Sequence, residues 1–566
     1  MTRLEQLRSQ RLIRHFTHSF LDNDLIAAGG EPHQLFVTTL ALLAGLGFTL
    51  SVLFAFRYAS IGIPLSVLRQ AHISDNLLVL LITMSVTALL TVIAWDGLLP
   101  SRRDAMVLSP FPIRPAAIFR ARLFATLLFF AVTFSALVFL PLLALPLCET
   151  TSASFSDLAR RAAAHLFCVS AAAAFMFFSV ILLQAILLAV LPYGRFLQIS
   201  SLLQILWLLA AFALFFLTPN PIVAVRHNLH WALWLPPYWF LDLWQSLAGG
   251  IWPFPFHTAF LALPAAALSV LGALSIYAAS YRRALRKAVE GLPLSHHGPS
   301  LLLRAFTTSL NATLLRDLRQ RAIFWFAART LFRHRNHRLL LSLYLGLALC
   351  WILSSISSVI SAGPAKFTLH PAPFTCTIPL TISAALLIGM RVLFSLPVEL
   401  RANWIFRTSA PPSDLTVTFA ARKLLVIVAI LPMALAPLPL YALSWGLPKA
   451  LGHTWFFALE SAILLQYLMH RFRKIPFTCS WLPGQGNLRV TLGVYFIQFG
   501  AAMTLLGALE TAALTRTSPQ PFIGVSLFLL LVLAILAWRR RSASSEPWSI
   551  IFDEQPTFAA NPLHLS

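Results

Sequence analysis

The sequence predicts an all-α, polytopic membrane protein with about twelve transmembrane helices, arranged as two six-helix pseudo-repeats. Three observations lead to this prediction: composition, the spacing of apolar runs and the placement of basic residues. Of the 566 residues, 58% are hydrophobic and only 11% are charged, whereas soluble domains carry about 25% charged residues. Apolar runs near the length of about 20 residues that crosses a bilayer recur along the chain. Arginines and lysines gather between them.

The apolar runs define twelve expected spans. The first six cover residues 34–56, 76–99, 117–147, 162–192, 196–218 and 257–280. The second six cover residues 339–361, 377–398, 424–447, 452–470, 490–514 and 522–538. The segment before the first span holds four arginines and four acidic residues. It is therefore too charged to be a cleaved signal peptide.

The distribution of positive charge predicts the orientation of the spans. If the N-terminus is cytoplasmic, 34 of the 42 lysines and arginines fall on the cytoplasmic side, as the positive-inside rule requires. Both termini are then cytoplasmic, in a multi-pass protein of the cell (inner) membrane. The net charge of +23 is explained by this topology. We therefore expect the lipid bilayer, and no nucleic acid, as a partner.

The two halves share a basic segment at the same place. Arg102 to Arg122, "RRDAMVLSPFPIRPAAIFRAR", joins spans two and three, and "RANWIFRTSAPPSDLTVTFAARK" joins spans eight and nine. We call these two segments the elbows. A shift of 300 residues aligns five identities between them without a gap: Ser109, Pro112, Phe119, Ala121 and Arg122 with Ser409, Pro412, Phe419, Ala421 and Arg422. Six spans followed by six spans is the natural division of the chain.

A basic amphipathic helix is expected before each half. Leucines, isoleucines and phenylalanines alternate with arginines before the first span and again before the seventh. This pattern is typical of helices at a membrane surface, although a solvated connector is the alternative. The expected domains are 1–33 (cytoplasmic amphipathic helix), 34–280 (first six-span half), 281–338 (cytoplasmic linker and second amphipathic helix), 339–538 (second six-span half) and 539–566 (cytoplasmic tail).

The sequence contains none of the catalytic motifs that we looked for. It has no Gly-Lys dipeptide and hence no phosphate-binding loop of the Walker A type, and it has neither an HExxH nor a GxSxG motif. Its five cysteines lie far apart, without the paired spacing of a zinc site. We therefore expect no enzyme activity in this chain alone, no cofactor and no metal.

Ionisable residues inside the spans are few. Glu460, within "WFFALESAILLQY", is the best candidate for a polar residue lining a transport pathway, because intramembrane charge is costly and often functional. Arg391 is expected to extend to the membrane surface. Glu510 is expected to pair with Arg516 near the outer surface.

An aromatic segment between spans five and six predicts a short outer helix. "HNLHWALWLPPYWFLDLWQSLAGG" contains four tryptophans and a tyrosine, residue types that favour the headgroup layer. Pro236 and Pro237 suit a helix start, and Gly249 and Gly250 suit its end. The connection between spans eleven and twelve is too short for such a helix, so the halves are not equivalent.

This layout resembles the ABC-2 type permeases, the membrane subunits of ATP-driven transporters. In that family a half has a cytoplasmic amphipathic helix, six spans and an elbow between spans two and three. It commonly also has short helices at the outer end of spans five and six. Here "SRRDAMVLSPFPIRPAAIFRARL" is similar to such an elbow. Two features depart from the family pattern: the halves are fused, and the second lacks the outer helix. The resemblance implies a cytoplasmic ATP-binding subunit in two copies, with export as the commoner direction.

The resemblance also implies that the elbows dock the ATPase. The implied docking residues are Arg102, Arg103, Asp104, Arg114, Arg401, Arg407 and Asp414. A loop that only turns the chain can be a few residues long, so a long, proline-braced basic segment suits docking. The alternative, that these arginines only fix topology, stays open. So do two other functions: a secondary transporter built from an internal repeat, and a non-transporting membrane scaffold.

Overall fold

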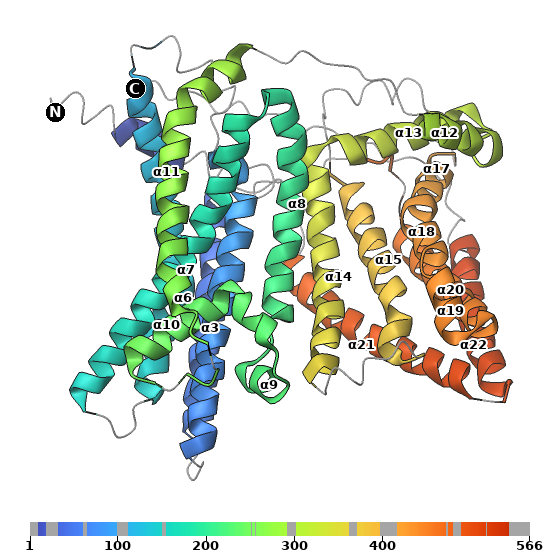
Figure 1. Ribbon diagram of the computed structural model, residues 1–566. Coiled ribbons are helices and arrows are strands. Elements are labelled where there is room, and N and C mark those ends of the chain that lie inside the picture. Colours follow the sequence, from blue (N-terminus) through green and yellow to red (C-terminus); the bar gives the residue numbers. More distant parts are fainter. Residues whose placement is uncertain are drawn as a thin grey trace, which may run out of the picture. The chain divides into compact units, whose positions relative to one another are not determined.

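The part of the chain that the structure describes is helical, without a β-strand, in a computed structural model of all 566 residues (Figure 1). The described residues are 10–17, 32–59, 65–98, 111, 113–149, 154–250, 252–254, 256–290, 301–361, 371–396, 416–470, 472, 474–478, 488–516 and 518–542. They form two compact units: residues 1–295 with 353–366, and residues 296–352 with 367–566.

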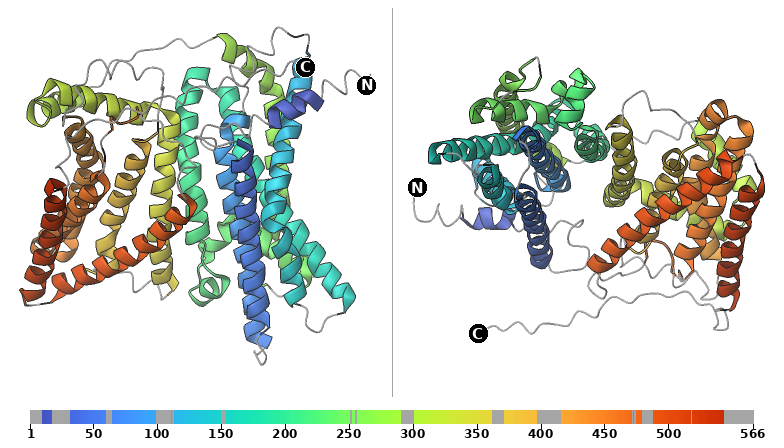
Figure 2. Two further views of the ribbon diagram at one scale, coloured as in Figure 1. Left: turned by 180° about the vertical axis from the view of Figure 1, so that it is seen from behind. Right: turned by 90° about the horizontal axis from the view of Figure 1, so that it is seen from below.

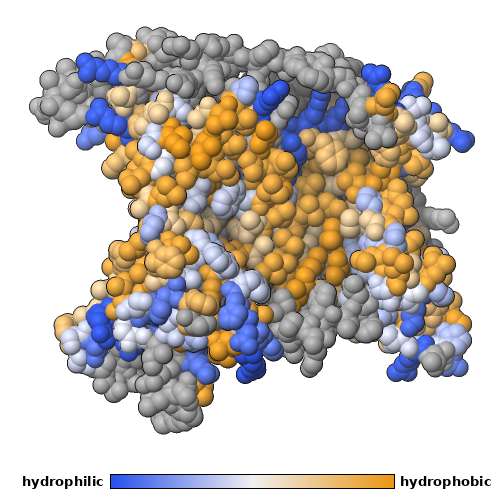
Figure 3. Space-filling model, in the orientation of Figure 1, coloured by the Kyte–Doolittle hydropathy of each residue, from blue (hydrophilic) through white to orange (hydrophobic). Residues whose placement is uncertain are grey.

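Ten helices of the described residues are long and apolar enough to cross a membrane. The chain is therefore an all-α, multi-pass membrane protein. Two further helices occupy predicted spans. α20 (Leu447–Met469) is long enough but carries polar side chains, among them His453 and Glu460. α21 (Leu488–Thr515) contributes a shorter apolar stretch, Phe499–Thr515. In each unit, the face visible in Figure 3 is apolar along the middle of the helices and more hydrophilic towards both ends.

The first unit is built around α7. Its helices are α2 (Pro32–Tyr58), α3 (Leu65–Ile93), α4 (Trp95–Leu98), α6 (Pro115–Glu149), α7 (Phe155–Val190), α8 (Tyr193–Leu217), α9 (Pro221–Arg226), the 3₁₀ turn His230–Trp234, α10 (Pro236–Ala248) and α11 (Ala259–Glu290). Helices α3, α6, α8, α10 and α11 all pack on α7. Alanines line its buried face, Ala172 and Ala185 among them. Small residues allow helix backbones to approach closely in membranes.

The start of α3 differs from the predicted span 76–99. The helix begins at Leu65, and its apolar stretch is Gln70–Ile93. Polar residues near its start are buried and bonded: Asp75 contacts Arg57 and Tyr58, and Asn76 contacts His165. A helix can continue through polar residues when other helices satisfy them.

The short helix predicted between spans five and six is confirmed as α10. It begins with Pro236 and ends at Gly249, whose φ of 73° is left-handed backbone that glycine adopts without strain. Burial raises the pKa of Tyr238, so its phenol stays protonated. Its hydroxyl donates a hydrogen bond to the Pro219 carbonyl at 2.8 Å.

The second unit contains the remaining helices. They are α12 (Leu301–Thr313), α13 (Leu318–Arg333), α14 (Arg335–Ser361), α15 (Pro373–Leu393), α17 (Thr416–Leu425), the π-helical turn Val426–Ile430, α18 (Leu431–Leu435), α19 (Leu438–Trp445), α20, α21 and α22 (Gln520–Ser542). Of α14, the part up to residue 352 belongs to this unit and the rest to the first. Helix α20 packs against α15, α19 and α22. Helix α21 runs obliquely across this unit and contacts α15, α20 and α22 (Figures 1 and 2).

Each unit has a basic helix packed on the helix that follows an elbow. In the first unit, residues 10–17 bury Phe16, and the Arg122 guanidinium of α6 lies 4.8 Å from the centre of its ring. In the second unit α13 packs on α17. The Lys423 ammonium of α17 donates to the Leu314 carbonyl at 2.5 Å and to Gln320 Oε1 at 2.7 Å.

Candidate functional site: a buried polar cluster of the second unit

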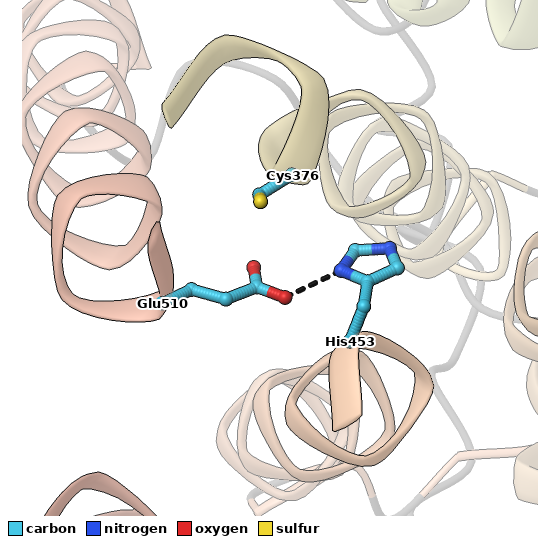
Figure 4. Close-up of side chains that lie close together, drawn as sticks. All are labelled: Cys376, His453 and Glu510. Carbon is cyan, nitrogen blue, oxygen red and sulfur yellow. Dashed lines mark hydrogen bonds and ion pairs between the residues drawn. The ribbon is translucent and has the colours of Figure 1, made fainter. Parts of the chain in front are cut away.

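Cys376, His453 and Glu510 meet inside the second unit, each from a different helix (Figure 4). Cys376 lies in the first turn of α15, His453 in the second turn of α20, and Glu510 near the end of α21. Their exposed fractions are 1%, 4% and 3%. We call these three residues the CHE cluster. In the predicted orientation of the spans, it lies towards the outer ends of all three helices.

A close approach between α15 and α21 brings Cys376 and Glu510 together. Gly507 lies one turn before Glu510. A Cβ atom at Gly507 would come within 2.6 Å of both the Pro373 carbonyl oxygen and the Thr377 side chain. No real side chain tolerates such contacts without movement of the backbone. The missing side chain at position 507 is therefore a condition for the CHE cluster.

Hydrogen bonds connect the three helices at this point. His453 Nδ1 and Glu510 Oε1 share a hydrogen bond. The Thr511 hydroxyl donates to the Gly507 carbonyl at 2.7 Å and lies 3.9 Å from the thiol sulfur of Cys376. Figure 4 shows the thiol, the imidazole and the carboxylate directed towards one point. One ligand atom from each residue lies within 4.8 Å of the other two.

Two aromatic rings of α19 hold the imidazole in place. Tyr441 and Trp445 are stacked, with ring centroids 4.1 Å apart and planes inclined by 8°. Both present themselves edge-on to the His453 ring, at 5.1 Å and 5.7 Å. The Tyr441 hydroxyl donates to the Thr375 carbonyl at 2.9 Å. The imidazole is therefore packed against two aromatic side chains.

Glu460, the predicted pathway residue, lies close to the CHE cluster. It is seven residues beyond His453 on α20, which places it on the same helix face two turns away. Its side chain is 7% exposed and interacts electrostatically with Glu510. Within the described residues, no lysine or arginine forms an ion pair with either glutamate. Two buried carboxylates without such a partner require protons or another cation.

Two expectations about charged residues in the spans are corrected or refined. The predicted pair of Glu510 with Arg516 is wrong, because Glu510 faces α15 and α20 and bonds to His453, while Arg516 is exposed. Arg391 is tied to α20: its Nε donates to the Leu468 carbonyl at 3.1 Å. Its guanidinium also lies over the Phe472 ring, 4.6 Å from the centre.

The elbow residues lie largely outside the described residues. These are Arg102, Arg103, Asp104, Arg401, Arg407 and Asp414. Arg114 is described and exposed, directly before α6. Its carbonyl accepts hydrogen bonds from the amides of Ala117 and Ile118, so it marks the first turn of that helix. An exposed arginine at this position is accessible to a partner protein or to lipid headgroups.

A second buried polar group lies in the first unit. Asp75, 2% exposed, accepts hydrogen bonds from Arg57 at 2.5 Å and from the Tyr58 hydroxyl at 2.7 Å. Asn76 bonds to His165 Nδ1 at 2.9 Å. This network ties α2, α3 and α7 together. Because its buried carboxylate already has an arginine partner, it is better explained as a structural feature than as a binding site.

No family model, curated protein or solved structure matches this chain. The chemistry of the CHE cluster therefore carries the interpretation of the site. A thiol, an imidazole and a carboxylate in an enclosed pocket exchange protons and bind metal cations. The sequence did not reveal the cluster, because its members come from three separate helices and no local spacing connects them.

Proposed function

We propose that this multi-pass membrane protein is the permease subunit of an ATP-driven transporter, similar to the ABC-2 type, and that it works as an exporter. Separate cytoplasmic ATPase subunits would supply the energy. The chain would lie in the cell (inner) membrane with both termini in the cytoplasm. The observation that carries this proposal is the repeated packing of a basic helix on the helix after each elbow.

In each unit, this packing holds in place the helix that follows the elbow. In the first unit Phe16 is buried against Arg122, and in the second unit Lys423 connects α17 to the turn between α12 and α13. A segment that only returns the chain to the membrane needs no such support. A segment that receives force from an ATPase does, because a flexible one would absorb the movement instead of passing it on.

The repetition of this arrangement favours two ATPase copies. Each unit contains one basic helix and one elbow, so one polypeptide would present two docking sites. Their arginines would pair with acidic side chains of the ATPase. Exposed ion pairs contribute about 0.2–1 kcal/mol each, so docking would depend on several of them together.

A secondary transporter is the second candidate, and the CHE cluster favours it. Secondary transporters couple transport to protons or cations through buried ionisable residues. His453, Glu510 and Glu460 form such a group. Reconstituted vesicles separate the two functions: uptake that follows an imposed ion gradient without ATP supports this candidate, whereas uptake that requires ATP and a partner supports the permease.

Charge removal at the elbows tests the proposal. Replacing Arg102, Arg103 and Arg114 together with glutamine should weaken ATPase binding while the protein still inserts normally. The matching change at Arg401 and Arg407 should affect the second docking site. Each variant is measured by pull-down of the ATPase and by a topology assay. Normal insertion with undiminished ATPase binding would defeat the docking proposal. Misinsertion would assign the arginines to topology.

A further inference from the structure

We propose that the CHE cluster, Cys376, His453 and Glu510, binds a divalent transition-metal cation of the zinc type. The three residues supply one sulfur, one nitrogen and one oxygen ligand. Zn²⁺ binds this combination of donors, and Co²⁺ occupies comparable sites. Mg²⁺ and Ca²⁺ are disfavoured, since both prefer oxygen ligands only.

The arrangement is close to the geometry that such a cation needs. Zinc bonds of 2.0–2.3 Å in tetrahedral directions place ligand atoms about 3.5 Å apart. The three ligand atoms of the cluster already lie within 4.8 Å of one another. A rotation of the Glu510 side chain away from His453 Nδ1 would open the position between them.

Charge balance also favours a cation at this place. Glu510 is 3% exposed, and its ion-pair partner is a histidine of similar burial. A divalent cation bound by a thiolate, a carboxylate and a neutral imidazole gives a site without net charge. Its binding releases the proton of the Cys376 thiol, because the thiolate is the ligand. Binding should therefore strengthen as the pH rises.

The surroundings resemble those of a metal site that exchanges its ligands. Three protein ligands leave a fourth position open, in contrast to structural zinc sites, which use four. The Thr511 hydroxyl lies 3.9 Å from the Cys376 sulfur, and the aromatic rings of Tyr441 and Trp445 pack edge-on against the imidazole. Such supporting groups orient the ligands and raise metal affinity.

Cobalt spectroscopy on the full-length protein in lipid nanodiscs tests the proposal directly. Protein stripped with a chelator is titrated with Co²⁺, whose thiolate charge-transfer band appears only if a cysteine is bound. Wild type should show this band together with tetrahedral d–d bands, and Zn²⁺ should abolish both. Cys376→Ser should lose the charge-transfer band. His453→Gln and Glu510→Gln should weaken binding about tenfold or more.

The control variant is Cys168→Ser, in α7 of the first unit. Cys168 is as buried as Cys376, each 1% exposed, but it has no place in the cluster. This variant should bind Co²⁺ as wild type does. Absence of a thiolate band in wild type, or its persistence in Cys376→Ser, overturns the proposal. Unchanged affinity in both His453→Gln and Glu510→Gln does so too. The titration uses neither ATP nor a partner, so its outcome is independent of the proposed transport function.

Discussion

Replacement of Asp242 by asparagine perturbs the junction between the outer helix and the last helix of the first unit. Asp242 lies on α10 and is fully buried. Its Oδ2 accepts hydrogen bonds from the backbone amides of Thr258 and Ala259, the latter at 2.8 Å. Its Oδ1 lies 3.1 Å from His257 Nδ1. Because Ala259 is the first residue of α11, this carboxylate caps α11 from a neighbouring helix.

The structure fixes the size of the expected effect. The asparagine amide can take two orientations. In one, its NH₂ group replaces Oδ2 and faces the backbone amides of Thr258 and Ala259, which then lack an acceptor. In the other, its oxygen accepts from both amides, but the negative charge that favours a helix N-terminus is lost. A buried polar group left unsatisfied costs about 1–3 kcal/mol. Together with about 0.3–1 kcal/mol for the lost negative charge at the start of α11, we expect Asp242→Asn to destabilise the first unit by about 1–4 kcal/mol.

The assay is the thermal midpoint in detergent at a fixed scan rate, combined with hydrogen exchange of the first turn of α11. Ser246→Ala on the same helix is the control, because its hydroxyl donates only to the Asp242 carbonyl, within α10. Asp242→Asn should lower the midpoint clearly and speed exchange at Thr258 and Ala259. If both variants have equal midpoints and unchanged exchange, the capping role of Asp242 is refuted.

Three further predictions concern packing, a buried ion pair and topology. Gly507→Ala should lower the free energy of unfolding by about 1–3 kcal/mol, and with it the thermal midpoint. Gly524→Ala, where a Cβ meets nothing within 4 Å, should be neutral or stabilising; equal effects would contradict the close approach of α21 to α15. Arg57→Gln should destabilise more than Asp75→Asn, because it leaves a buried carboxylate unpaired; the reverse order, measured by the same midpoints, would contradict this. A reporter fused after Ser566 should be cytoplasmic, and an extracellular signal would refute the topology.

Features determined by residues that are neighbours along the chain could be predicted from the sequence. Most expected spans coincide with one long helix, because a run of about 20 apolar residues has few alternatives in a bilayer. The ninth, 424–447, differs, since it is divided among α17, the π-helical turn Val426–Ile430, α18 and α19. The limits of α10 were equally clear, since Pro236 and Gly249 each impose a backbone conformation. The amphipathic pattern before the seventh span corresponds to α13, which buries Phe324 and Leu331.

Features that depend on contacts between distant helices were not predictable. The CHE cluster joins three helices, and Glu510 was assigned to Arg516 because only neighbours along the chain could be judged. The start of α3 was missed for the same reason: the predicted span begins at residue 76, whereas the helix begins at Leu65 and its Asp75 bonds to Arg57 of α2. A polar residue in an apolar run is informative only when its partners are known.

The ATPase activity of the chain with and without its partner tests the proposed function most directly. The protein is isolated from its own membranes in mild detergent, and ATP hydrolysis is measured before and after bound proteins are removed. We expect hydrolysis only in the fraction that contains a nucleotide-binding protein, because the chain itself has no phosphate-binding loop. Readdition of that protein should restore it. Robust hydrolysis by the stripped chain, or substrate uptake in vesicles without ATP, would contradict the proposal.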